Sequence, residues 1–187
     1  RQAALGAGIP DSVPAWTMNK VCGSGLKAVV SGAQASALGD AEAIVAGGME
    51  SMTNVPYALP KARWGYRMDV EARGELIDLM VYDGLWEIFY GYHMGNTAEE
   101  ITKRYGFTRQ QQDEIGYLSH LRARKAMAEG LFKDEIIPLP IPQKKGEPLV
   151  FDTDERPMDT SMEKMAKLAP AFRKDGTVTA GNSSGIN

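Results

Sequence analysis

The clearest pattern in the chain is a run of small and apolar residues with helical spacing, placed between two extended segments. The run covers residues 23–38 and predicts an amphipathic helix, which Gly39 ends as a C-cap. The β-branched segment 13–21 and the apolar segment 41–48 each suit a strand. This order predicts a β-α-β unit with a parallel sheet. The apolar positions of the helix are Leu26, Val29, Val30, Ala33 and Leu38.

Two longer helices are predicted after an excursion of loops and short helices over residues 54–95. Capping boxes, from Thr97 to Glu100 and from Thr108 to Gln111, predict where these helices begin. The second helix runs through Ala126, and its mixed charges are interpreted as a solvated outer face.

The last part of the chain is expected to return to the first section. A strand with proline-limited edges is predicted within 132–142, followed by an acidic loop and a short helix within 146–172. Residues 176–186 then suit a strand that runs into a glycine loop.

The composition bears on which partners the protein binds and on the cellular compartment in which it works. The net charge of -3 over 187 residues provides no basic field for nucleic acid or an anionic membrane. The single cysteine excludes an internal disulfide, and no signal-like run is present, so a cytoplasmic location is expected, or the mitochondrial matrix in a eukaryote. Because the chain starts with Arg1 and stops within a Gly/Ser/Asn segment, we interpret it as an internal fragment of a longer protein. No metal site is predicted.

Cys22 is the candidate nucleophile. It lies between the extended segment and the start of the helix, where the positive end of the helix dipole favours thiolate over thiol. It also follows the carboxyl end of a predicted strand, where open α/β sheets place their chemistry. The alternative is a small buried apolar residue. Gly23 and Gly25 would let a substrate approach closely, or they would simply ease the helix start.

Four segments in order resemble the thiolase family. They are "MNKVCGSGLKAVVSGAQ", "VAGGMESMTNVPYALPKAR", "DGLWEIFYGYHMGNTAEE" and "DGTVTAGNSSGIN", and the resemblance covers essentially the whole chain. It implies an α/β, thiolase-like αβαβα fold. Residues 1–53 would be part of the N-terminal core domain that holds the nucleophile, 54–178 the CoA-binding loop domain, and 179–187 the return to the core. The C-terminal domain, with the family's activating histidine, second cysteine and asparagine, would be absent.

The resemblance also implies roles for individual residues. Cys22 would carry the acyl group, His93 and Met94 would line the pantetheine channel, and Ser184 would hydrogen-bond the pantetheine arm. Without the resemblance, His93 reads as a satisfied core or surface histidine and Ser184 as a turn residue. His120 is interpreted as a surface residue. Further channel residues, each of which also suits a core, are Leu85, Phe172 and Ala180, and Arg156 would meet the adenine or phosphate end of CoA.

The implied activity is acyl transfer between CoA thioesters, of the acetyl-CoA C-acetyltransferase type in fatty acid metabolism. Two acetyl-CoA would condense to acetoacetyl-CoA and CoA, or the reverse thiolysis would occur, with no cofactor besides the CoA thioesters. The alternatives are a 3-ketoacyl-CoA thiolase of fatty-acid degradation and a non-catalytic acyl-CoA or lipid-binding module. The fragment alone is predicted to be inactive.

The resemblance implies a homotetramer, a dimer of dimers, for the full-length protein. The segment 13–21 would pair at the dimer interface, and the excursion 56–73 would join dimers. The basic run in that excursion is therefore assigned to contacts between dimers rather than to phosphate; its members are Lys61, Arg63 and Arg67.

Overall fold

The computed structural model describes residues 1–68, 70 and 74–186, and it divides into two compact units. The first unit covers 1–84 and the second covers 85–186. Each is described by itself. Residues 69 and 71–73 of the predicted excursion lie outside the described residues.

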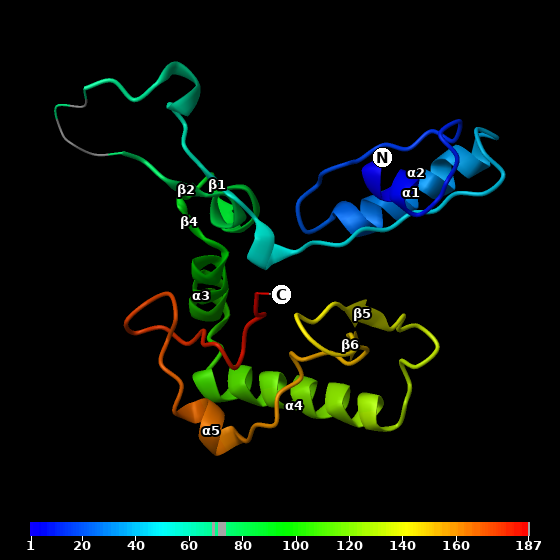
Figure 1. The fold of residues 1–187 in the computed structure, drawn as a ribbon. Helices are drawn as coiled ribbons and strands as arrows, with labels where there is room; N and C mark the ends of the chain where they lie inside the picture. Colours follow the sequence, from blue (N-terminus) through cyan, green and yellow to red (C-terminus); the bar gives the residue numbers. More distant parts are fainter. Residues whose placement is uncertain (69, 71–73, 187) are drawn as a thin grey trace. The chain divides into compact units, whose positions relative to one another are not determined.

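The first unit is organised around helix α2, Ser24–Ala37, which confirms the helix predicted from the apolar spacing (Figure 1). Gly23 is its N-cap. The extended chain at 41–48 runs against this helix, because a Cβ added at Gly32 would lie 3.2 Å from Cγ2 of Ile44. A short helix, α1, Gln2–Gly6, precedes α2.

The two strands predicted beside α2 do not form. Segments 13–21 and 41–48 carry no ladder, apart from an isolated bridge between Lys20 and Cys22. A strand exists only through hydrogen bonds to a neighbouring strand. Among the described residues of the first unit, neither segment has such a neighbour, and 41–48 packs on the helix by its side chains instead.

The excursion contains the predicted loops and short helices, together with short strands that were not predicted. Strands β1, Tyr57–Ala58, and β2, Ile77–Asp78, pair antiparallel with Tyr57 opposite Asp78. The short helices of this region are η1, Met52–Asn54, η2, Ala62–Trp64, and η3, Met80–Leu85, a π-helix that ends where the second unit begins.

Much of the apolar surface of the first unit is open. Leu26 on α2 is 74% exposed, Leu38 at its C-cap is 80% exposed, and Trp16 is 69% exposed. The periodicity therefore located the helix correctly, but within this unit its apolar stripe is not covered.

The second unit is built on two helices. Strands β3, Trp86–Glu87, and β4, Tyr92–His93, form an antiparallel hairpin that leads into α3. Helix α3 is Met94–Tyr105, and Gly106 ends it in the left-handed conformation at φ 72°. Helix α4, Arg109–Ala128, follows directly. None of the helices in the described part of the chain combines the length and the hydrophobicity that a membrane span requires.

The structure confirms one of the two predicted capping boxes. Thr108 and Gln111 exchange hydrogen bonds at the start of α4, in the predicted positions. Helix α3, by contrast, begins at Met94, before Thr97, and its N-cap is His93, whose Nδ1 accepts a hydrogen bond of 3.0 Å from Gly95 N–H. The Thr97 box was wrong because the imidazole already occupies the capping position.

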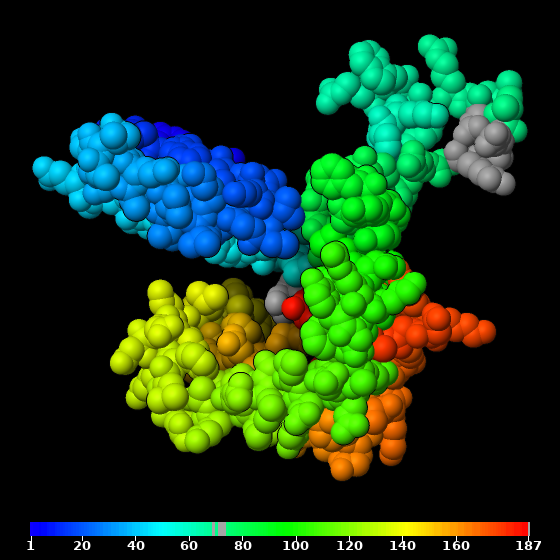
Figure 2. Space-filling view, turned by 180° about the vertical axis from the view of Figure 1, so that it is seen from behind, coloured from blue at the N-terminus to red at the C-terminus, as the bar shows by residue number. Residues whose placement is uncertain are grey.

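The remaining elements are short. Strands β5, Leu139–Ile141, and β6, Leu149–Phe151, pair antiparallel; β5 confirms the predicted strand, whereas β6 lies in the predicted acidic loop. Helix α5, Met162–Ala166, is the predicted short helix and packs against α4 (Figure 1), a contact that Figure 2 shows from behind between the orange and green residues.

The strand predicted within 176–186 is absent from the described residues, where side-chain hydrogen bonds hold an extended loop instead. The core of the second unit is small and mixed. Met165 and Val178 are its buried apolar residues, beside the buried polar residues Glu99, Asp113 and Thr179.

We expect Thr108→Ala to lower the free energy of unfolding by about 1 kcal/mol, because the Gln111 N–H loses its capping oxygen. Urea titration followed by circular dichroism measures this change. Thr108→Ser, which keeps the hydroxyl, is the matched control and stays near wild type. A midpoint of Thr108→Ala equal to that of Thr108→Ser would contradict the role of the cap.

Candidate functional site

Cys22 is a free and exposed cysteine of the first unit. It directly precedes the N-cap Gly23, so it lies just before the first turn of α2. The thiol is open to solvent, which fits a reacting group better than the alternative of a buried apolar residue.

The turn that presents Cys22 is strained. Val21 has φ 48°, in the left-handed region that β-branched residues avoid. Neighbouring polar side chains hold it there: Asn19 Oδ1 accepts from Val21 N–H at 2.8 Å, and Ser24 Oγ donates to the Val21 carbonyl at 2.6 Å. Ser24 Oγ also accepts from Lys20 N–H at 2.8 Å. Such over-determined strain is typical of functional turns.

The two glycines after Cys22 have different surroundings. A Cβ at Gly23 would meet the Lys20 carbonyl oxygen at 3.4 Å, which is an ordinary contact. A Cβ at Gly25 would meet nothing within 4 Å, so the surface beside it is open. The role of both glycines in substrate approach stays a prediction.

In the second unit, His93 and Phe172 come together. Their rings stack with centroids 4.7 Å apart and planes inclined by 25°. Gly95 makes this possible, because a Cβ there would collide with the Phe172 ring. Since His93 Nδ1 accepts from Gly95 N–H, the proton of the neutral imidazole is on Nε2, which is the nitrogen left to donate to a ligand. Met94 begins α3 and is 37% exposed, and Leu85 is half-buried at the start of the unit.

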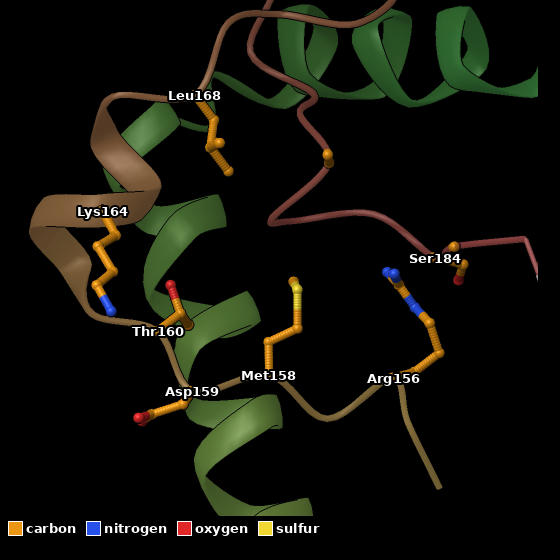
Figure 3. Close-up of a pocket in the computed structure, with 9 residues that line it drawn as sticks. Arg156, Met158, Asp159, Thr160, Lys164, Leu168 and Ser184 are labelled. Atoms are coloured by element: carbon orange, nitrogen blue, oxygen red, sulfur yellow. The ribbon is translucent and has the colours of Figure 1, made fainter.

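A second group of predicted residues lines one open pocket of about 320 Å³. Arg156, Ala180 and Ser184 all belong to it (Figure 3). The Arg156 side chain extends toward the backbone that carries Ser184, where a Cβ at Gly185 would collide with the guanidinium. The complete lining is Arg156, Met158, Asp159, Thr160, Lys164, Leu168, Ala180, Ser184 and Gly185.

The pocket suits an anionic ligand with a partly apolar arm. Arg156 and Lys164 supply cationic groups, and a guanidinium is well matched to phosphate. Asp159, the carboxylate of the lining, is engaged by an ion pair with Arg124. Met158, Leu168 and Ala180 contribute apolar atoms to the wall, and Thr160 and Ser184 contribute hydroxyl groups.

His120 was wrongly interpreted as a surface residue. It is half-buried, and its Nδ1 accepts a hydrogen bond of 3.1 Å from Met158 N–H, so it supports the pocket wall from α4. The solvated face predicted for α4 was also wrong in part. Polar residues with helical spacing on that helix bind the segments beside it; they are Arg109, Asp113, His120 and Arg124.

The residues that hold the segment 171–184 were not predicted from the sequence. Glu99 and Asp113 are buried carboxylates whose partners lie in that segment. Arg173 anchors its start, donating to Glu100 Oε1 at 2.6 Å and to Asn96 Oδ1 at 3.1 Å. The guanidinium lowers the pKa of Glu100, and the carboxylate in turn raises the pKa of Arg173.

The Glu100–Arg173 pair predicts a dependence of stability on pH. A lowered carboxyl pKa in the folded state stabilises the protein fully above the unfolded value of 4.5, and the contribution is lost as the pH falls through the folded value. We therefore expect the difference in urea midpoint between wild type and Glu100→Gln to be largest near neutral pH and to shrink below about pH 4.5. A difference that stays constant from pH 7 to pH 3 would contradict this linkage.

Comparison with known proteins gives consistent matches. The family described as "Thiolase, N-terminal domain" matches residues 1–187. The chain is 56% identical to a protein of Pseudomonas aeruginosa and 57% identical to one of Syntrophomonas wolfei, both named "Acetyl-CoA acetyltransferase", and each match covers 100% of this chain and 47% of the relative.

The crystal structure of the Bacillus anthracis acetyl-CoA acetyltransferase is similar with a TM-score of 0.91 and 45% identity, covering 99% of this chain and 46% of that one. It confirms the fold class predicted from the sequence. The chain spans about half the length of the relatives it matches.

Proposed function

Because the chain belongs to the thiolase family, we propose that it supplies the acylated cysteine and part of the coenzyme A site of an acetyl-CoA C-acetyltransferase. The observation that carries the proposal is the match of the whole chain, at 56% and 57% identity, to relatives with that name. Since the chain spans about half of each relative, the activity is proposed for the full-length protein.

The proposed reaction begins at Cys22. Its thiolate attacks the thioester carbonyl of acetyl-CoA, the C–S bond to CoA breaks, and the CoA thiolate leaves as an acetyl thioester forms on Cys22. A second acetyl-CoA then loses an α-proton to a base, and the resulting carbanion attacks the acetyl-cysteine carbonyl. The Cys22 thiolate leaves, and acetoacetyl-CoA is released. The reverse sequence is thiolysis.

The base is proposed to lie outside this chain, in the part of the family fold that carries the activating histidine and second cysteine. For this reason the 187 residues by themselves are expected to turn over no substrate. The exposed Cys22 and its strained turn support the nucleophilic step alone.

The pocket of the second unit is proposed to bind coenzyme A. We propose that Arg156 and Lys164 bind its phosphates and that the Ser184 hydroxyl hydrogen-bonds the pantetheine arm, which is supported by the presence of all three residues in the pocket lining. His93 Nε2–H and the Phe172 ring are proposed to line the same channel with Met94, Leu85 and Ala180. Coenzyme A thioesters are the substrates, and no further cofactor is proposed.

The full-length protein is proposed to be a cytoplasmic homotetramer, a dimer of dimers. Support comes from the first unit, where Trp16 and the apolar face of α2 are exposed. Surfaces of this kind are covered in stable assemblies.

We predict that Cys22→Ser in the full-length protein lowers both condensation and thiolysis by several orders of magnitude, because an alkoxide is far less accessible than a thiolate near neutral pH. Steady-state assays of acetoacetyl-CoA formation and cleavage measure the effect. Ser24→Thr, which keeps the hydroxyl that braces the turn, is the neighbouring control. Substantial turnover by Cys22→Ser would overturn the assignment of the nucleophile.

A further inference from the structure

We propose that Glu99 and Asp113 are positioning residues for coenzyme A binding: each holds the loop 177–185 in the shape that brings Ala180 and Ser184 to the pocket. This inference rests on the proposed function. Neither carboxylate takes part in the proposed reaction, and neither lines the pocket.

The Glu99 carboxylate is directed at the start of the loop. It is 5% exposed, and its oxygens accept from Thr177 N–H at 2.8 and 3.0 Å, from Val178 N–H at 2.8 Å and from the Thr177 hydroxyl at 2.9 Å. A buried carboxylate is costly unless such donors satisfy it. The loop backbone at these residues is therefore fixed against α3.

The Asp113 carboxylate holds the middle of the loop through Asn182. It is 1% exposed and accepts from Asn182 Nδ2 at 2.9 Å and from Arg109 Nε at 2.8 Å. Asn182 in turn accepts from Thr179 N–H at 2.7 Å and donates to the Thr177 carbonyl at 3.0 Å. Asn182 thus closes the turn on which Ala180 lies, and Asp113 attaches that turn to α4.

Arg109 connects the same carboxylate to the opposite wall. Its Nη2 donates to the carbonyls of Met165 at 2.7 Å and Leu168 at 3.0 Å, and Leu168 lines the pocket. The pair Arg109–Asp113 therefore sets both sides of the pocket from one turn of α4.

Close packing restricts the loop to this one position. A Cβ at Gly116 of α4 would lie 2.9 Å from the Gly181 carbonyl oxygen, and a Cβ at Gly181 would lie 2.7 Å from Leu168 Cδ1. Figure 1 shows the loop, in red, beside α3 and the start of α4. The backbone between Thr179 and Ser184 consequently has little room to shift while these contacts persist.

The test compares acetylation of Cys22 by acetyl-CoA and by S-ethyl thioacetate in the full-length protein. The second donor transfers the same acetyl group but lacks the pantetheine arm and the nucleotide. In Glu99→Gln and Asp113→Asn, an amide of nearly the same shape replaces the carboxylate. Its NH2 group takes the place of one acceptor oxygen, and the negative charge is lost. Single-turnover rates are measured against concentration for both donors, with Glu114→Gln, an exposed neighbour on α4, as the matched control.

We expect the half-saturating concentration of acetyl-CoA to rise about 10-fold in each variant, the effect of one charge-assisted hydrogen bond. The limiting rate and the rate with S-ethyl thioacetate change less than about 2-fold. Equal losses with both donors would mean a general structural defect and overturn the inference, as would Glu99→Gln matching Glu114→Gln.

Thr177→Val is measured alongside, because it removes the hydroxyl that donates to Glu99 and leaves the backbone donors of Thr177 and Val178 in place. The same hydroxyl also contacts Gln112 Oε1 at 3.3 Å. This variant decides the question if Glu99→Gln does not fold. We expect the half-saturating concentration of acetyl-CoA to rise about 3-fold in Thr177→Val, with the rate from S-ethyl thioacetate unchanged. If Thr177→Val shows no such selective effect, the inference is overturned. If the wild type is not acetylated, the proposed function is contradicted. If the wild type is acetylated and the variants behave like it, only the positioning role is contradicted.

Discussion

The buried carboxylate of Glu99, with the donors of Thr177 and Val178 around it, is the contact on which the second unit depends. Helix α3 contributes the carboxylate, and the loop contributes the backbone N–H groups of Thr177 and Val178 and the Thr177 hydroxyl that donate to it. Because both groups lose water when they meet, deleting one partner and leaving the other buried costs more than the pair contributes in net stability. The loop is consequently held by polar contacts, where an apolar core of two buried residues would be too small to hold it.

The same logic explains why the pocket is formed by segments that are far apart in the sequence. Asp113 and His120 are on one face of α4; Asp113 attaches the loop that carries Ser184, and His120 attaches the segment that carries Arg156. Helix α4 thus acts as a rigid support for the two walls. The family match and the arrangement of these walls support a single proposal, a coenzyme A site assembled on α4.

The sequence predicted those parts of the fold that depend on interactions between residues close together in the chain. Helix α2 followed from apolar spacing, and the start of α4 followed from Thr108 and Gln111. The strands at 13–21 and 41–48 failed because pairing depends on a neighbouring strand, which no local pattern reveals.

The candidate site was predictable to a similar degree. The position of Cys22 before the helix identified it as a candidate from the sequence itself. Arg156, Ala180 and Ser184, which share a pocket, were predicted only from the resemblance. The positive φ of Val21 was not predictable, because a β-branched residue by itself favours extended backbone. The polar face of α4 was predicted to face solvent, whereas part of it binds other segments of the chain. The sequence did not show this, because polar residues with helical spacing form the same pattern whether water or protein groups satisfy their hydrogen bonds.

Intact-protein and peptide mass spectrometry of the full-length protein after brief mixing with acetyl-CoA tests the central claim most directly. The account predicts one added acetyl group per chain, located on the peptide that contains Cys22, and its removal when excess CoA is added. An acetyl group on any other residue, or none under conditions where acetoacetyl-CoA is formed, would contradict it.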